Sequence, residues 1–311
     1  MRRAGTFSVI ASLAPFVAAT LVACSSAKPP PPVPASEAAA HLADGGGTGL
    51  PSSSSSISSD ETDRETRRIA RMLRRVSTAR GLETKRAVPG KILSRVDLIA
   101  RVKDHVAKEI PNEAIRNEGL VLQLLGFVPP KFDYEAETFA LLEAQLAGFY
   151  EPADGSMYMA ADLDEENATA TLAHELVHAL QDQHYDLGPR SKYKPGQGDK
   201  ASAGAALAEG DATSAMIDVM VQGSGGTALD VPEDVFTQQV MASMSSGPGA
   251  SAPHAMRASL VSPYIDGTIF IHALRKRGGW KEVDAVWRNP PVTTEQVLHV
   301  DKYDTHEAAA V

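Results

Sequence analysis

Two histidines and a glutamate stand at a spacing that suits metal-dependent hydrolysis. His174, Glu175 and His178 form an HExxH pattern. On a helix, residues four apart lie on one face about one turn apart, so both imidazoles can point at a single ion. Glu175 then starts beside that ion and can act as general base on a water molecule bound to it, as in zinc proteases. The pattern also arises by chance on surface helices, so its surroundings decide between the two interpretations.

The sequence around the motif predicts a helix. Residues 168–187 are rich in Ala and Leu, and no Pro or Gly interrupts them before Gly188. Asn167 or Thr169 is placed to cap the first turn. The histidines therefore have the regular backbone that their geometry requires.

A third ligand is expected on the following helix. Zinc bound by two histidines takes one more protein ligand and keeps a fourth position for water. The longer HExxHxxGxxH pattern is not met, and Glu209 in the segment ALAEGDA is the candidate, because a carboxylate among small apolar residues is costly to bury unless it is paired or metal-bound. Asp211 is a competitor or a partner of a ligating histidine, and Asp182 is another such partner. Residues 209 and 211 lie about 200° apart around a helix, so only one of them can face the ion.

Three later residues are candidates for stabilising the oxyanion that develops during acyl transfer: Tyr264, His272 and His299. Tyr264 and His299 are the preferred pair, because each is predicted at a junction between a loop and a helix, where a side chain can reach a cleft. The alternative for each of the three is a buried, hydrogen-bonded structural role.

The segments HELVHALQDQHYDL and ALAEGDA resemble the Glu-zincin metallopeptidases, and GFYEPADGSMYM resembles the strand that precedes their zinc helix. With VSPYIDGTIFIHALRKRGGW and PPVTTEQVLHVDKY, the resemblance extends to a bacterial group of uncharacterised metallopeptidase-like proteins and covers roughly residues 115–305. It implies a zincin-like fold, a zinc ion held by His174, His178 and Glu209, and water activation by Glu175. The usual ExxxD pattern would place Asp at position 213, where this chain has Thr213. The related chains are expected to run further past Tyr303 than this one.

Residues 1–23 predict a bacterial lipoprotein signal peptide. Arg2 and Arg3 precede an apolar stretch that is too short and too interrupted for a membrane span. The stretch ends in LVAC, which resembles a lipobox, whose cysteine becomes the first mature residue and carries the lipid. Cys24 is the only cysteine, so no intrachain disulfide can form. With Ser25 after it, the chain is expected to be lipid-anchored in the bacterial cell envelope at the outer membrane; an ordinary secretory signal is the alternative.

Residues 24–60 predict a disordered tether, because they are rich in Pro, Gly and Ser and cannot form a core. Residues 61–311 are then the catalytic domain. The 311-residue chain is 43% hydrophobic, which supplies a sizeable core, and its net charge of −9 argues against nucleic acid as a partner. The expected partners are a peptide or protein substrate and, through Cys24, a membrane.

The predicted fold class is α+β and mainly helical, with a small β-sheet edging the active-site cleft. A hairpin is expected at residues 148–161, and the free edge of its strand before the motif helix could pair with an extended peptide. The predicted helices cover residues 60–80, with Ile69, Met72, Leu73 and Val76 on its buried face, and residues 92–110, 112–125, 133–147, 201–221, 233–245, 264–277 and 280–287, followed by a helix that Thr293 caps.

Two other functional classes remain open at this point. One is a catalytically inactive envelope lipoprotein that binds zinc for structure, in which a fourth protein ligand replaces the water; His184 is the nearest spare one. The other is a purely structural envelope protein with a chance motif. Glu175 favours the enzyme, because a structural zinc site does not need it.

Overall fold

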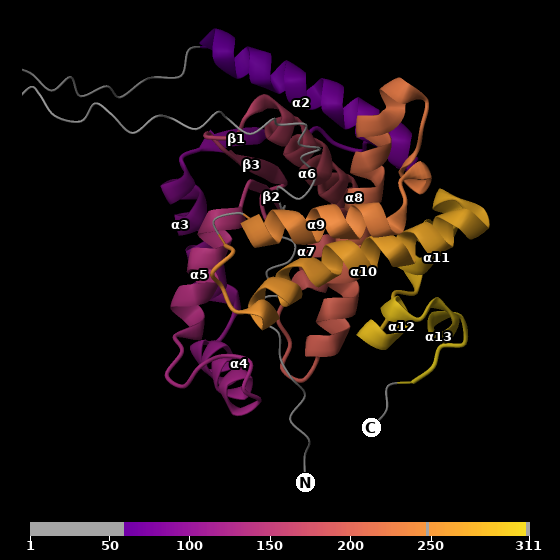
Figure 1. Ribbon diagram of the computed structural model, residues 1–311. Helices are drawn as coiled ribbons and strands as arrows, with labels where there is room; N and C mark the ends of the chain where they lie inside the picture. The colour runs from indigo at the N-terminus through magenta and orange to yellow at the C-terminus, as the bar shows by residue number, and fades with distance from the viewer. Residues whose placement is uncertain (1–58, 247–248, 309–311) are drawn as a thin grey trace, which may run out of the picture.

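The computed structural model describes residues 59–246 and 249–308 (Figure 1). The predicted signal peptide, the lipid attachment site at Cys24 and the tether up to residue 58 lie outside the described residues. Residues 59 and 60, at the end of the predicted tether, are the first two of helix α2 (Ser59–Arg80).

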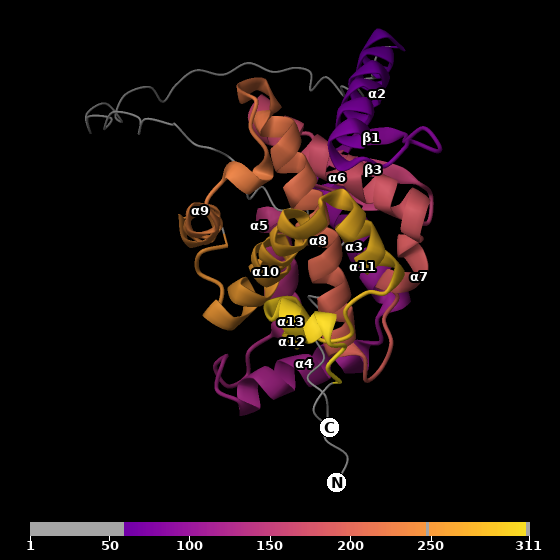
Figure 2. The same cartoon turned by 90° about the vertical axis from the view of Figure 1, so that its right-hand side faces the viewer.

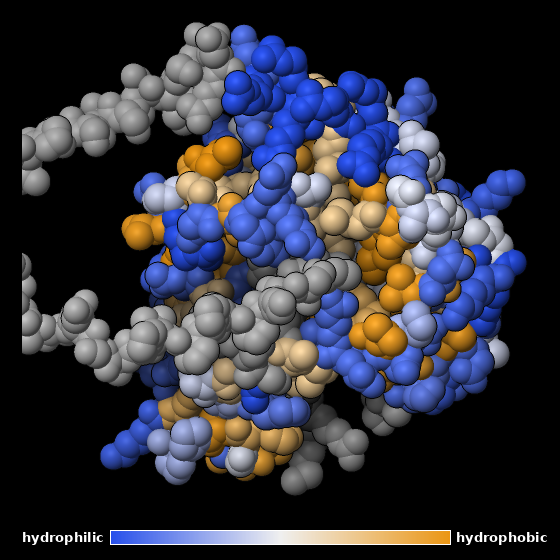
Figure 3. Space-filling view, turned by 45° about the horizontal axis from the view of Figure 1, so that its top comes forward, coloured by the Kyte–Doolittle hydropathy of each residue, from blue (hydrophilic) through white to orange (hydrophobic). Residues whose placement is uncertain are grey.

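Helix α2 packs along one side of the domain. Its predicted apolar stripe of Ile69, Met72, Leu73 and Val76 is buried, with exposures of 6% or less, which confirms the amphipathic pattern. Hydrophilic side chains cover its outer face (Figure 3). The helix lies against α6 (Glu165–Tyr185) and α8 (Gly198–Val221), along the top of the view in Figure 1.

A three-stranded sheet lies against the motif helix α6. Its strands are β1 (Gly90–Leu93), β2 (Gly148–Glu151) and β3 (Ser156–Ala160), in the order β1-β3-β2. Strand β3 pairs antiparallel with β2, as the hairpin predicts, and parallel with β1. The central strand β3 is buried along its whole length, because α6 covers the sheet. The prediction of a small sheet beside the motif helix is confirmed.

Strand β1 was not expected, because residues from Ile92 onward were predicted to be helical. The helix α3 (Arg95–Glu109) begins only after Ser94, whose side chain accepts a hydrogen bond from the Asp97 amide and caps it. The preceding four residues pair instead with β3, in register from Gly90 beside Met157 to Leu93 beside Ala160. A tertiary strand pairing therefore overrides local helix propensity here.

Two long helices carry the middle and the C-terminal part of the fold. Helix α8 packs against α6, and α10 (His254–Gly278) packs along α8 (Figures 1 and 2). Helix α10 starts ten residues before the predicted Tyr264, and Pro263 lies inside it. Proline removes one intrahelical hydrogen bond, so it signals a break in the sequence, but tertiary packing on α8 keeps the helix continuous.

The remaining helices complete two apolar clusters. The larger cluster joins α2, α3, the sheet, α6 and parts of α8 and α10, and the smaller one joins α7, the start of α8, α10 and the C-terminal helices. The helices not yet bounded are α4 (Asn112–Leu124), α5 (Tyr134–Gln145), α7 (Leu187–Ser191), α9 (Glu233–Ser246), α11 (Trp280–Arg288), α12 (Thr294–Leu298) and α13 (Val300–Asp304), with 3-10 turns at Gln222–Ser224 and Ala228–Asp230.

The described residues form a mainly helical α+β protein with one small sheet, which confirms the predicted class. None of the described helices combines the length and the apolar character that crossing a membrane requires.

Candidate metal centre

Helix α6 presents the motif residues as one buried face. Its N-cap is Asp164, whose side chain accepts a hydrogen bond from the backbone amide of Asn167 at 2.8 Å. The prediction of Asn167 or Thr169 as the cap is therefore wrong by one turn, because Glu165 and Glu166 already belong to the helix. Acidic residues in this first turn also suit the positive end of the helix dipole.

Three acceptor atoms converge between α6 and α8. The Nε2 atom of His174 lies 3.0 Å from Oε2 of Glu209 and 3.1 Å from Nε2 of His178, and His178 Nε2 lies 3.4 Å from the same Glu209 oxygen. With metal–ligand distances of about 2.0–2.1 Å, the corners of a tetrahedral site lie about 3.3 Å apart. The triangle therefore has the size that one metal ion requires. The three buried side chains of His174, His178 and Glu209 could hold a metal ion with three protein ligands, and we call them the metal group.

Gln181 fixes the tautomer of His178, and the sequence interpretation missed it. The Gln181 amide nitrogen donates to the carbonyl of Ala208 at 2.9 Å, so its Oε1 atom is the acceptor for His178 Nδ1 at 2.8 Å. The Nδ1 atom must then carry the proton, which leaves the Nε2 lone pair facing the group. The same side chain ties α6 to the residue before Glu209. Its only sequence signal is its position one turn after the second histidine.

The group needs a positive charge among its three acceptors. Glu209 Oε1 is buried and has no hydrogen-bond partner among the described residues. Burial raises the pKa of Glu209, but the two histidines outweigh burial and lower it. Burial lowers the pKa of His178, but Glu209, Glu175 and Gln181 together outweigh burial and raise it to about 9. A proton or a metal cation can supply the missing charge, and the pairing of two imidazoles with one carboxylate suits a metal.

Glu175 is fully buried beside the group. Burial raises its pKa to about 8, His178 opposes this rise, and the charge of Glu209 adds to it. The backbone N–H of Tyr150 on β2 faces the carboxylate and, as the smallest of these effects, lowers the pKa. A bound dication would favour the ionised carboxylate and bring this pKa down again.

The strand edge nearest Glu175 belongs to β2 and not to β3. The strand β3, which immediately precedes α6, is central in the sheet, so the expectation that its free edge could take a peptide is wrong. The hydrogen bond from Ala160 N–H to the Ala147 carbonyl fixes the antiparallel pattern. The backbone groups of Gly148 and Tyr150 consequently point away from β3. If a peptide pairs with this sheet beside the candidate site, it pairs with β2.

Asp211 and Asp182 do not touch the histidines. Asp211 faces the opposite side of α8 from Glu209, as the helix geometry predicts, and it accepts hydrogen bonds from Arg80 and from the Trp287 indole at 2.7 Å. Asp182 accepts from Arg86, from the Tyr150 hydroxyl and from the Leu187 amide. Both aspartates therefore bind other elements to the core, and neither orients His174 or His178.

His184 stands six residues after His178, at the spacing of the third histidine in the HExxHxxGxxH pattern. The chain has Gln181 where that pattern has glycine, and α6 continues as a helix through it. His184 consequently faces away, and its Nε2 atom lies 2.7 Å from the carbonyl oxygen of Glu83. It does not supply a fourth ligand to the group.

A glycine pair brings α10 against α8 beside Glu209. A Cβ atom on Gly210 would lie 2.1 Å from the backbone of Gly267, and one on Gly267 would lie 2.0 Å from the carbonyl oxygen of Ala206. Gly210 therefore faces α10 and lets that helix approach α8 closely. The contact places Tyr264, one turn before Gly267, at the metal group.

The structure separates the three oxyanion candidates. Tyr264 is buried, and its ring centroid lies 5.9 Å from that of His174. It reaches the group from within α10 and not from a helix start. His272 is buried two turns further along, and neither ring nitrogen has a hydrogen-bond partner in the described part of the chain. His299 is half exposed and pairs with Glu295 at 3.9 Å, so the structure does not bring it to the buried group.

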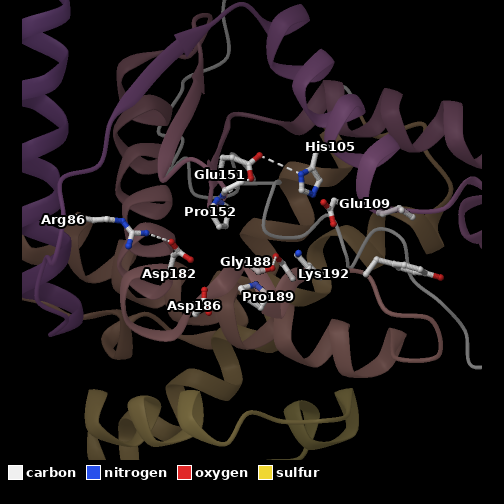
Figure 4. Close-up of a pocket in the computed structure, with 14 residues that line it drawn as sticks. Arg86, His105, Glu109, Glu151, Pro152, Asp182, Asp186, Gly188, Pro189 and Lys192 are labelled. Atoms are coloured by element: carbon white, nitrogen blue, oxygen red, sulfur yellow. Dashed lines mark hydrogen bonds and ion pairs between the residues drawn. The ribbon is translucent and has the colours of Figure 1, made fainter.

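Two cavities flank α7, which follows the motif helix. The first has a volume of about 430 Å³ and contains the pairs His105–Glu151 at 3.9 Å and Arg86–Asp182 at 2.6 Å (Figure 4). The second has a volume of about 450 Å³ and includes Glu209 in its wall. The second cavity therefore adjoins the metal group directly.

Comparisons with protein-family models, with curated proteins and with solved structures found no match. The resemblance to Glu-zincins rests on the motif segments themselves.

Proposed function

We propose that this protein is a zinc-dependent peptidase in which His174, His178 and Glu209 hold the ion. The observation that carries the proposal is the triangle of acceptor atoms with edges of 3.0–3.4 Å, with the buried Glu175 carboxylate beside it. Two imidazoles and one carboxylate are the ligand set of several hydrolytic zinc enzymes, and they keep one position open. The same group in a structural role would require a fourth protein ligand, and His184 bonds elsewhere.

Zinc, when bound, lowers the pKa of a coordinated water and polarises the carbonyl of a substrate. Glu175 accepts a proton at its carboxylate and returns it to the leaving amine. Its burial keeps bulk water from competing for that proton. Gln181 holds His178 in the tautomer that directs Nε2 at the ion. Tyr264, whose ring centroid lies 5.9 Å from that of His174, is the proposed donor to the developing oxyanion.

The test compares metal content with turnover on the full chain. Purified protein is expected to contain about one zinc per chain, as for a single ligand set. Glu175→Gln is expected to keep the metal and to lose peptide hydrolysis by roughly a hundredfold to ten-thousandfold, because only proton transfer is removed. His178→Ala is expected to lose both. A Glu175→Gln protein that hydrolyses peptides at the wild-type rate would exclude this mechanism, and a metal-bearing wild type without hydrolysis would favour the inactive zinc-binding module.

A further inference from the structure

The second cavity beside α7 is built from three parts of the chain. Helix α7 and the loop after it form one side, the first three turns of α8 form another, and Trp287 with Pro290 and Pro291 closes the third. The small residues Ala201, Gly204, Ala205 and Ala208 form one stripe of α8 that leaves this volume open. A Cβ atom added at Gly204 would meet no atom within 4 Å, so the space beside this residue is open.

The cavity floor is rigid and apolar. The Trp287 ring stacks on Tyr185 at a centroid distance of 4.7 Å and an interplanar angle of 4°. Its indole nitrogen is held by Asp211, so the ring cannot turn away. The aliphatic part of an extended side chain could pack on this floor without ordering the protein further.

The cavity rim is cationic in a chain whose net charge is −9. Arg190, Lys192, Lys194 and Lys200 all line it, against the acids Asp186 and Glu209. None of these four cations forms an ion pair with a residue that the structure describes. The Glu209 carboxylate contacts His174 and His178, so its negative charge does not neutralise the cations of the rim.

The first cavity shows the opposite balance. Its acids Glu109, Glu151, Asp182 and Asp186 outnumber Arg86 and Lys192, and two of the acids are already paired (Figure 4). Positive side chains therefore outnumber acids only in the second cavity, which Glu209 shares with the metal group, although Lys192 lines both cavities.

We infer that the second cavity is a substrate subsite for a carboxylate, so that the favoured substrates are peptides with an acidic residue or a free C-terminus near the scissile bond. This inference rests on the proposed peptidase function. A Glu side chain would place its methylenes on Trp287 and its carboxylate among the rim cations. Because the cations lie at the protein surface, the attraction weakens with salt.

The experiment uses the zinc-loaded full chain and two sets of short neutral peptides. In one set a single Glu is moved along the sequence, and in the other a single Gln, each with a free or an amidated C-terminus. Binding is measured by calorimetry on the Glu175→Gln variant, and cleavage by mass spectrometry on the wild type. The test variant is Lys194→Glu/Lys200→Glu, which changes only this cavity. The matched control, Arg116→Glu/Lys131→Glu, makes the same charge change on and beside α4.

The expected result is at least about tenfold tighter binding of Glu over Gln at one position, or of the free over the amidated end, which corresponds to about 1.4 kcal/mol. The preference is expected to disappear in Lys194→Glu/Lys200→Glu and to persist in the control. A preference for Glu over Gln identifies a side-chain carboxylate as the bound group, and a preference for the free over the amidated end identifies the C-terminus. Cleavage without any preference for a carboxylate overturns the subsite and leaves the peptidase intact. Selective binding that depends on Lys194 and Lys200, without cleavage by the wild type, supports the subsite and overturns the peptidase.

Discussion

At the residue scale, two carboxylates on α8 have separate tasks although they are two positions apart. Glu209 meets the two histidines, whereas Asp211 binds Arg80 and Trp287 on the opposite side. Both are fully buried, so exposure cannot distinguish them. The two residues differ in their hydrogen-bond partners, and these partners predict different consequences of substitution.

Glu209→Ala removes one of the three proposed ligands and is expected to lower zinc affinity by more than about a hundredfold, beyond the range seen for residues that only orient a ligand. Asp211→Ala is expected to leave the affinity of the folded protein near that of the wild type. It should instead lower the free energy of unfolding by roughly 3–5 kcal/mol, because the buried Arg80 loses a partner. Zinc titration against a competing chelator and urea denaturation separate the two effects. If Asp211→Ala strips the metal while Glu209→Ala retains it, the ligand assignment is reversed.

His272 is expected to make stability depend on pH. Burial, with a smaller effect from Arg275, lowers its pKa from 6.5 to about 4. The unfolded chain therefore takes up a proton first, so the stability that neutral His272 permits is complete above about pH 6.5 and is lost as the pH falls toward 4. Between pH 7 and pH 5 this amounts to about 2 kcal/mol. His272→Leu should remove that loss in urea denaturation, whereas the exposed control His299→Leu should keep it. If the free energy of unfolding depended on pH equally in the wild type and in His272→Leu, this account would be contradicted.

The convergence of the two histidines and Glu209 could be predicted because the histidine geometry is local to a helix and Glu209 is an otherwise unpaired carboxylate. Gln181 could not, since nothing in QDQ shows which polar side chain faces inward until Ala208 is placed beside it. Asp211 was assigned to the wrong neighbours for the same reason, because Arg80 lies 131 positions away. His299 was chosen from its position at a helix boundary, and a boundary gives no direction to a side chain.

At the scale of elements, the contact between α8 and α10 depends on two glycines. Gly267→Ala is expected to lower the free energy of unfolding by about 1–3 kcal/mol, because its Cβ would collide with the Ala206 carbonyl. Gly204→Ala on the same helix pair has open space and is expected to raise stability by up to about 1 kcal/mol through helix propensity. Thermal and urea denaturation of the two variants provide the measurement. Equal stability of the two alanine variants would show that the helices do not approach this closely.

The helices with clear apolar periodicity, such as α2, could be predicted nearly to the residue. Strand β1 could not, because its four residues carry no strand signal of their own and its partner β3 lies more than sixty positions later. The start of α10 was placed too late, since Pro263 marks a break by local rules. In both cases tertiary packing decides between conformations that the local sequence leaves close in energy.

At the scale of the whole molecule, the lipid anchor remains a prediction from the sequence alone. Cys24→Ser is expected to move the protein from the membrane fraction to the soluble or unprocessed pool, because no other cysteine can accept the lipid. Fractionation followed by detection of the chain provides the measurement. Ser25→Ala is a neighbouring control that should leave the distribution unchanged. A Cys24→Ser protein that is processed normally and stays membrane-bound would rule out the lipoprotein assignment.

The junction at Arg80 has a mechanical consequence. The Arg80 guanidinium joins the last turn of α2 to Asp211 of α8 and Asp284 of α11 through ion pairs. The Arg80 side chain has no exposed surface. A load applied to the chain from its N-terminal side enters the described domain at α2 and runs along that helix. Part of that load then passes through Arg80 to α8 and α11. Because Asp211 is two residues from Glu209, tension on the chain would arrive beside the proposed metal ligands.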